Sequence, residues 1–113
     1  VAAGLAIKGY IPITYTIATF NVYKTVEQIK VDICYPNLGV IIVGVGSGLS
    51  YADLGATHHA IEDIGVLRSI PNLNIVAPSD PLELESLVAF KKHSSNVLHG
   101  IISASGSMDK AAK

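Results

Sequence analysis

A short apolar run that opens into a glycine-rich segment is the feature that most constrains the fold of this chain. Residues 40–43 are all apolar, as expected for a strand that is buried on both faces of a parallel sheet. Four glycines follow within residues 44–55, and His58 and His59 come just after them. Open α/β sheets hold ligands at the carboxyl ends of their strands, so this order predicts a ligand-binding loop.

The composition favours one folded domain whose apolar surface is partly covered by another domain or subunit. The chain has 113 residues, of which 50% are hydrophobic and only 15% are charged, so it can fill a core. Its net charge is −1, from 8 basic and 9 acidic residues. This balance indicates neither a nucleic acid nor an anionic membrane as a partner.

Membrane and export signals are not evident, and the start of the chain looks like the middle of a structure. The longest apolar run, residues 39–45, is far shorter than the roughly 20 residues of a spanning helix. No signal-peptide pattern is present, and the single cysteine, Cys34, is most simply a buried small hydrophobe in a reducing cytoplasm. The chain does not begin with Met, and residues 1–6 resemble a packed helix, so we expect it to be a fragment of something longer.

The rest of the pattern alternates strands with helices. Strands are predicted at residues 11–17, 40–43, 73–76 and 97–102. Helices are predicted over residues 1–8 with Gly9 as the stop, from Thr19 as N-cap to Pro36, over residues 59–68, and from Asp80 as N-cap through Pro81 and Glu83. This alternation predicts an α/β domain with a doubly wound, mostly parallel sheet and helices on both faces. Residues 103–113 are expected to form a flexible tail.

The residues alone leave several alternatives open at the glycine-rich segment. Glycines alternating with other residues after a strand are also typical of a nucleotide-binding oxidoreductase domain, although Leu49 stands where the third glycine of that fingerprint would be. His58 and Glu62 are four residues apart and could share a helix face, but no third ligand is evident, so no metal site is predicted. Thr57 could equally cap a helix with His58 in its first turn, and Phe20 and Tyr23 would by default be core aromatics.

Several segments, in the right order, resemble the pyrimidine-binding domain of the thiamine diphosphate-dependent transketolase family. That family includes 1-deoxyxylulose-5-phosphate synthase and the E1 subunits of 2-oxoacid dehydrogenases. The matching segments are residues 2–6 (AAGLA), 20–29 (FNVYKTVEQI), 48–51 (GLSY), 55–63 (GATHHAIED), 67–73 (LRSIPNL) and 78–80 (PSD). The resemblance covers about residues 1–85 and is strongest to transketolase-like proteins whose two halves are separate polypeptides.

The resemblance implies a cofactor, a reaction and a partner. Thiamine diphosphate would lie between this domain and a diphosphate-binding domain or subunit, which would hold the Mg²⁺ and the diphosphate. The reaction would transfer a two-carbon ketol unit between sugars or sugar phosphates, in a homo- or hetero-oligomer that is at least a dimer. By this alignment the family's catalytic glutamate falls upstream of Val1, so the chain alone is expected neither to bind the cofactor tightly nor to turn over.

The resemblance also assigns roles to four residues of this sequence. Phe20 and Tyr23 fall where the family places aromatic rings around the aminopyrimidine, and they are one helical turn apart. Ile17 stands where classical transketolases have their foremost stacking phenylalanine. His58 matches the histidine near the thiazolium, where an imidazole can shuttle protons or hydrogen-bond a developing oxyanion.

Other positions depart from the classical family pattern. Gly46 and Ser47 replace a His-Asp pair, and Leu54 replaces an aspartate that reads sugar hydroxyls. The predicted last strand lacks the usual phosphate-binding arginine. These departures argue against a standard sugar-phosphate transketolase, and they leave a non-catalytic interaction subunit as the other alternative.

Overall fold

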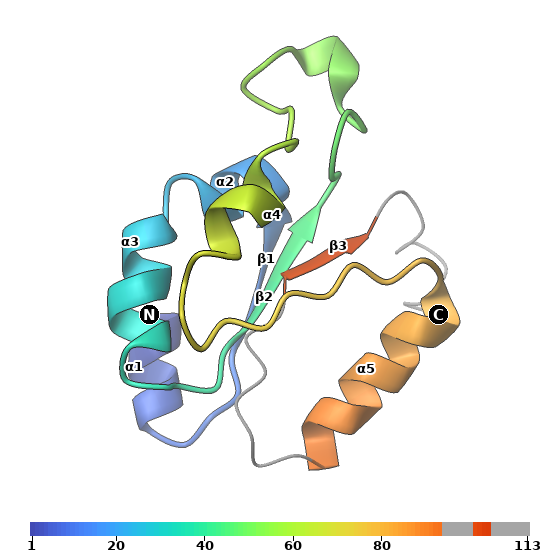
Figure 1. The fold of residues 1–113 in the computed structure, drawn as a ribbon. Helices are drawn as coiled ribbons and strands as arrows, with labels where there is room; N and C mark the ends of the chain where they lie inside the picture. Colours follow the sequence, from blue (N-terminus) through green and yellow to red (C-terminus); the bar gives the residue numbers. More distant parts are fainter. Residues whose placement is uncertain (94–100, 105–113) are drawn as a thin grey trace.

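Three parallel strands form the centre of the molecule. The computed structural model describes residues 1–93 and 101–104 of the chain (Figure 1). The strands β1 (Ile13–Ile17), β2 (Ile41–Val45) and β3 (Ile101–Ala104) make one sheet in the order β1-β2-β3. Both strand pairs are parallel, with Ile17 opposite Val45 and Val45 opposite Ala104. The predicted α/β class with a parallel sheet is therefore confirmed.

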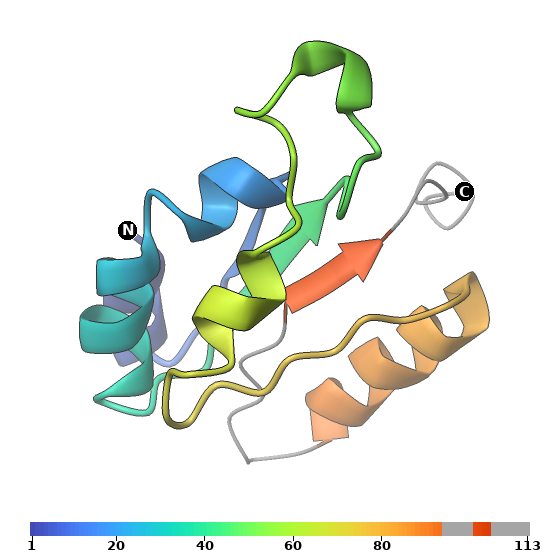
Figure 2. The same cartoon turned by 45° about the horizontal axis from the view of Figure 1, so that its top comes forward.

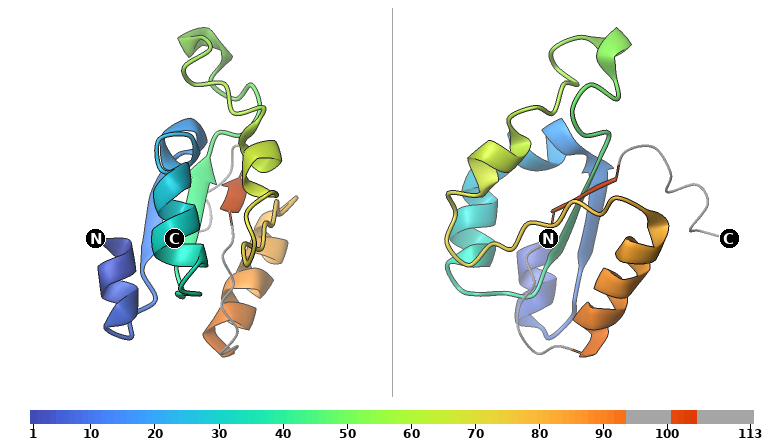
Figure 3. Two further views of the ribbon diagram at one scale, coloured as in Figure 1. Left: turned by 60° about the vertical axis from the view of Figure 1, so that its left-hand side comes forward. Right: turned by 45° about the vertical axis from the view of Figure 1, so that its right-hand side comes forward.

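Helices flank the sheet on two sides. The described helices are α1 (Ala2–Ile7), α2 (Ala18–Val22), α3 (Val26–Gln28), the π-helix η1 (Ile29–Cys34), α4 (Asp63–Leu67) and α5 (Pro81–His93), together with the 3₁₀ helix η2 (Ala52–Leu54), which projects beyond the end of β2. The strands lie between the group α1 to α3 and α5, as the turned views show (Figures 2 and 3). No helix in the described ranges has the length and apolarity to cross a membrane.

One hydrophobic cluster joins the helices to a single face of the sheet. Its buried members are Val22, Ile29, Ile33, Cys34, Val40, Ile42, Leu67 and Ile70. Val22, Ile29 and Ile33 come from the helix predicted between Thr19 and Pro36, and the small residues of α1 pack against the cluster. Cys34 is a buried free thiol whose pKa is raised by that burial, so its expected role as a small hydrophobe is confirmed.

The two faces of the sheet are covered to different extents. Ile42 and Val43 point to opposite faces of β2, and both are buried, as predicted for this run. On the neighbouring strand β1, Ile13 and Tyr15 point to the same face of the sheet as Val43. Ile13 is 62% exposed and Tyr15 is 58% exposed. This face of β1 is therefore left uncovered by the described part of the chain, in keeping with an apolar composition too rich for so small a domain.

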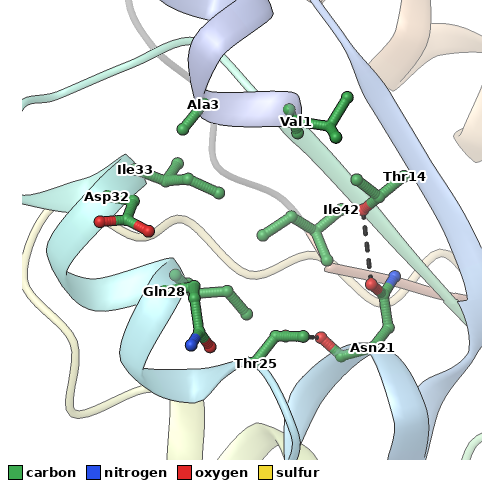
Figure 4. A pocket seen from close by; sticks show the side chains of 11 residues that line it. Val1, Ala3, Thr14, Asn21, Thr25, Gln28, Asp32, Ile33 and Ile42 are labelled. Carbon is green, nitrogen blue, oxygen red and sulfur yellow. Dashed lines mark hydrogen bonds between the residues drawn. The ribbon is translucent and has the colours of Figure 1, made fainter.

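A buried amide fixes α2 to the strands. Asn21 is buried, and its Nδ2 donates a hydrogen bond of 2.8 Å to the Val43 carbonyl, while its Oδ1 accepts one of 3.5 Å from the Thr14 hydroxyl. A cavity of about 230 Å³ lies beside this amide, between α1 and the helical segment α3–η1 (Figure 4). The residues that line it come from the start of the chain, the segment from Asn21 to Ile33 and the strands β1 and β2, and they include none of the four predicted site residues.

The predicted helix from Thr19 to Pro36 is broken near Thr25, and its predicted cap is wrong. Ile17 occupies the N-cap position of α2, and Thr19 is buried inside that helix. The break arises because the Thr25 hydroxyl donates to the Asn21 carbonyl, while the Thr25 N–H donates to the Val22 carbonyl at 3.1 Å. A side-chain donor thus takes the acceptor that a continuous α-helix would have used.

The predicted helix over residues 59–68 is also shorter than expected. Ala60 exchanges two backbone hydrogen bonds of 2.9 Å with Gly48, so residue 60 is extended and α4 begins only at Asp63. Of the predicted strand at residues 73–76, only Val76 makes a β-bridge, while Leu73 and Ile75 pack against the core cluster. The apolar pattern of this segment therefore indicated correctly that Leu73 and Ile75 contact the core.

The predicted ends of the helices and strands are partly confirmed. Gly9 stops α1 with a φ of +87°, and the Asp80 carboxylate accepts the Glu83 N–H at 2.8 Å at the start of α5, both as predicted. Of the predicted final strand, residues 97–100 lie outside the described residues, and β3 covers Ile101–Ala104. Ser103 and Ala104, which were expected in the tail, are thus strand residues, and residues 105–113 lie outside the described part.

Replacing Leu67 with alanine tests the position of α4 on the core. Leu67 is fully buried, so Leu67→Ala should lower the free energy of unfolding by about 2–5 kcal/mol. Leu82→Ala is the matched control, because Leu82 on α5 is 75% exposed and its loss should change stability by no more than about 0.5 kcal/mol. Urea unfolding followed by circular dichroism measures both, and equal effects of the two substitutions would contradict this packing.

Candidate functional site

The candidate site lies where β1 and β2 end. Ala18 begins α2 directly after β1, and the glycine-rich segment leaves β2 through Gly46 and Gly48, whose φ angles are +72° and +61°. The bridge between Gly48 and Ala60 closes residues 49–59 into a projecting segment, which we call the lobe. The lobe rises from the end of β2 at the top of the molecule (Figure 1). The predicted ligand-binding loop therefore stands at the carboxyl edge of the sheet.

His58 lies on the returning arm of the lobe and contacts two aromatic rings. Its ring centroid is 5.1 Å from that of Phe20 on α2, with an interplanar angle of 73°. The Tyr51 ring is 6.4 Å away at 72°. The His58 N–H donates to the Gly55 carbonyl at 2.9 Å, so His58 sits in a turn and not in the first turn of a helix. The structure thus brings Phe20 and His58 into direct contact.

A second pair of side chains links α2 to the start of α4. The Tyr23 hydroxyl donates to Glu62 Oε2 at 2.7 Å and accepts from the Glu62 N–H at 3.2 Å. Burial, followed by the hydrogen bond to the Glu62 side chain, raises the pKa of Tyr23 above its usual value. Tyr23, Glu62 and three neighbours line an open cavity of about 440 Å³; the neighbours are Ala56, His59 and Ile61.

The four predicted site residues meet at this edge in different ways. Phe20 is 42% exposed and Tyr23 is 36% exposed, so neither is a core aromatic. Phe20 touches His58 directly, whereas Tyr23 reaches the same edge through Glu62. Ile17 is half-buried at the last position of β1, and neither of the two His58 ring contacts involves it.

Hydrogen bonds restrain both histidines. The Thr57 hydroxyl is 3.0 Å from His58 Nδ1, so it can serve either tautomer of the imidazole. His59 Nε2 donates to the Ala52 carbonyl at 3.2 Å, which ties His59 to η2 at the tip of the lobe. His59 is therefore held as part of the lobe, while the His58 ring faces α2.

Tyr51 and Glu62 contact the predicted site residues, and sequence reasoning gave neither of them this role. In the sequence, Glu62 was considered only as a possible metal ligand on the same helix face as His58. In the structure the two residues do not share a helix, because His58 lies in a turn and Glu62 is the N-cap of α4. Within residues 1–93 and 101–104, no group of three or more His, Cys, Asp or Glu side chains could hold a metal ion. The contact of Tyr51 with His58 depends on the fold of the lobe, which leaves no periodic signal in the sequence.

The arrangement supplies what a flat heteroaromatic ligand needs on one side. Two partly exposed aromatic rings offer faces for stacking, and the imidazole can donate, accept or transfer a proton. The Glu62 carboxylate adds an acceptor beside Tyr23. These are the kinds of group that the aminopyrimidine implied by the family resemblance would need.

The hydrogen bond between Tyr23 and Glu62 can be tested by titration. Glu62→Gln removes the charge that helps to hold the tyrosine proton, so the Tyr23 pKa should fall part of the way towards about 10, with burial retaining the rest of the shift. Because folding raises this pKa, the contribution to stability is full below pH 10 and is lost as pH rises through the folded-state pKa. Carbon-13 NMR of the tyrosine rings measures the shift, and Glu27→Gln is the control. An unchanged Tyr23 titration in Glu62→Gln would refute the link.

Comparison with known proteins identifies the family. A family model described as the transketolase pyrimidine binding domain matches residues 1–98. An apulose-4-phosphate transketolase subunit of Actinobacillus succinogenes is 45% identical over 89 residues, which are 79% of this chain and 29% of the relative. The 1-deoxy-D-xylulose-5-phosphate synthase of Thermus thermophilus is 42% identical over 87 residues, which are 77% of this chain and 14% of the relative.

Solved structures agree with this match. A split-gene transketolase, solved as an inactive beta4 tetramer, has a TM-score of 0.76 and 33% identity, covering 93% of this chain and 33% of that one. The transketolase of Leishmania mexicana has a TM-score of 0.74 and 26% identity, covering 92% and 15%. The chain spans less than a third of the length of the relatives from Actinobacillus succinogenes and Thermus thermophilus. The chain belongs to the transketolase pyrimidine-binding domain family.

Proposed function

We propose that this chain forms the pyrimidine-binding side of a thiamine diphosphate site in a transketolase-type transferase. The enzyme would transfer a two-carbon ketol unit between sugars or sugar phosphates. The observation that carries this proposal is the contact of His58 with Phe20 at the carboxyl ends of β1 and β2. The family assignment supports it, as do relatives that are named transketolase subunits.

In this proposal the aromatic residues bind and the histidine handles protons. Phe20 and Tyr23 would hold the aminopyrimidine, with Ile17 at the end of β1 as an apolar neighbour. Thiamine diphosphate, when bound, supplies the carbanion chemistry of the reaction. Thr57 is paired with His58 Nδ1, so Nε2 is the nitrogen that would exchange a proton with the substrate.

The proposal includes a partner that completes the site. A diphosphate-binding domain or subunit would hold the Mg²⁺ and the diphosphate, and the active unit would be a homo- or hetero-oligomer, at least a dimer. Relatives that are named as single subunits of a transketolase support a division into separate polypeptides. The exposed side chains of Leu54 and Ile61, which are 56% and 63% exposed, offer apolar area near the site for that partner. We further place the enzyme in the cytoplasm, which the free thiol of Cys34 supports.

The substrate is proposed to differ from that of a classical transketolase. Leu54 lies on η2 at the tip of the lobe, where the classical family has an aspartate that reads sugar hydroxyls. An exposed leucine cannot accept those hydrogen bonds, so the sugar would be recognised by other groups.

Calorimetry with thiamine diphosphate and Mg²⁺ tests the shared site. The titration should show binding when the chain is mixed with the subunit encoded next to it and little or none with the chain alone. Binding by neither sample would contradict the proposal and favour a non-catalytic interaction subunit. Binding of NAD to the chain alone would also contradict the proposal, because it would support a nucleotide-binding oxidoreductase domain.

The neighbouring histidines provide a matched pair of variants for the proposed proton transfer. His58→Ala should reduce kcat of the reconstituted enzyme by roughly 10²- to 10⁴-fold, the usual contribution of a general acid–base. His59→Ala is the control, because His59 bonds the Ala52 carbonyl, and it should reduce kcat far less. Steady-state kinetics measures both variants, and equal losses would remove the proton-transfer role from His58.

A further inference from the structure

We propose that Tyr51 is a positioning residue for His58, and that Gly46 is a glycine because the Tyr51 ring occupies the space beside it. The inference rests on the proposed function in one respect, namely that His58 is the group whose placement matters. Its structural part concerns only contacts within the chain, so it can be tested without any cofactor.

The environment of Gly46 supports the first half of the proposal. Gly46 is buried at the end of β2 with a φ of +72°, in the left-handed region that favours glycine. A Cβ atom built at this position would overlap the ring of Tyr51, with Cε2, Cδ2 and Cζ as its nearest neighbours. The Tyr51 ring therefore lies directly against the backbone of Gly46, and no other residue leaves room for it.

The same ring touches His58 on another side. The Tyr51 and His58 centroids are 6.4 Å apart with an interplanar angle of 72°, which is an edge-to-face arrangement. Phe20 makes a similar contact from α2 at 5.1 Å, and the Thr57 hydroxyl is 3.0 Å from Nδ1. Three groups thus restrict the orientation of the imidazole, and only Tyr51 connects it to the backbone at the exit of β2.

The backbone of the lobe holds these groups in place. The paired hydrogen bonds between Gly48 and Ala60 fix both ends of the lobe. The Tyr51 carbonyl accepts the Leu54 N–H at 3.0 Å, which starts η2 directly after Tyr51. The path from Gly46 through Tyr51 to His58 is therefore a continuous set of contacts anchored at the sheet.

Gly48 provides a control that separates a steric effect from backbone strain. It also has a positive φ, +61°, but a Cβ atom there would meet nothing within 4 Å. Gly46→Ala and Gly48→Ala therefore impose similar backbone strain, and only the first displaces the Tyr51 ring. Because the overlapping atoms belong to the outer part of a side chain, the ring can swing away while the fold is kept.

The test is NMR of the His58 ring in the 113-residue chain, with thermal unfolding as the check on folding. Nuclear Overhauser contacts between the His58 and Tyr51 rings should be present in the wild type and in Gly48→Ala and should be lost in Gly46→Ala. Tyr51→Phe should keep the His58 ring resonances, since it keeps the ring, whereas Tyr51→Ala should move them. The double variant Gly46→Ala/Tyr51→Ala should match Tyr51→Ala, because no ring is left to displace.

Two results would overturn the proposal. One is a His58 spectrum in Gly46→Ala that equals that of Gly48→Ala, and the other is an unchanged spectrum in Tyr51→Ala. If Gly46→Ala does not fold, the comparison of Tyr51→Phe with Tyr51→Ala decides the matter alone.

Kinetics of the reconstituted enzyme separates this inference from the proposed function. Tyr51→Ala should lower kcat by roughly 10- to 100-fold with little change in KM, and Tyr51→Phe should restore it, because a misplaced catalytic group costs rate more than binding. If the spectra change as expected but His58→Ala keeps its activity, Tyr51 still positions His58, and it is the proton-transfer role of His58 that fails.

Discussion

The parallel pairing of β1 with β2 is the constraint on which the site depends. In this register Ile17 lies opposite Val45, so the start of α2 and the exit of the glycine-rich segment meet at one edge of the sheet. The hydrogen bonds between Gly48 and Ala60 then return the chain towards α2. His58 reaches Phe20 because both of these backbone pairings are made, and neither side chain could be placed there by its own element alone.

Apolar residues are buried to different extents on the two faces of the sheet. One face of the sheet is closed by α1 to α4 around Ile42, which is buried. On the other face Ile13 and Tyr15 remain more than half exposed, as are Leu54 and Ile61 near the site. Covering these groups with another surface would add stability, because the burial of apolar area is favourable.

Local sequence signals predicted the elements whose causes are local. The apolar run before Gly44, the stop at Gly9 and the cap at Asp80 each depend on residues within a few positions, and each was predicted correctly. The juxtaposition of Phe20 with His58 came from the family resemblance, because no periodicity relates residues so far apart.

The features that were missed come from competition between side chain and backbone or from long-range pairing. Thr25 breaks the helix predicted from Thr19 to Pro36, because its hydroxyl donates to the Asn21 carbonyl, and the spacing of apolar residues does not reveal this bond. Ala60 lies outside the predicted helix because it pairs with Gly48. The contact of Tyr51 with His58 depends on this pairing, which brings the two ends of the lobe together. Sequence reasoning therefore assigned Phe20 and His58 to one candidate site but could not give the contacts within it.

The most direct test of the central claim is a crystal structure of the chain with its partner subunit, thiamine diphosphate and Mg²⁺. The account predicts the aminopyrimidine against Phe20 and Tyr23, with the His58 imidazole facing the reacting end of the cofactor. A cofactor bound away from the carboxyl ends of β1 and β2, with Phe20 and His58 outside the site, would contradict it.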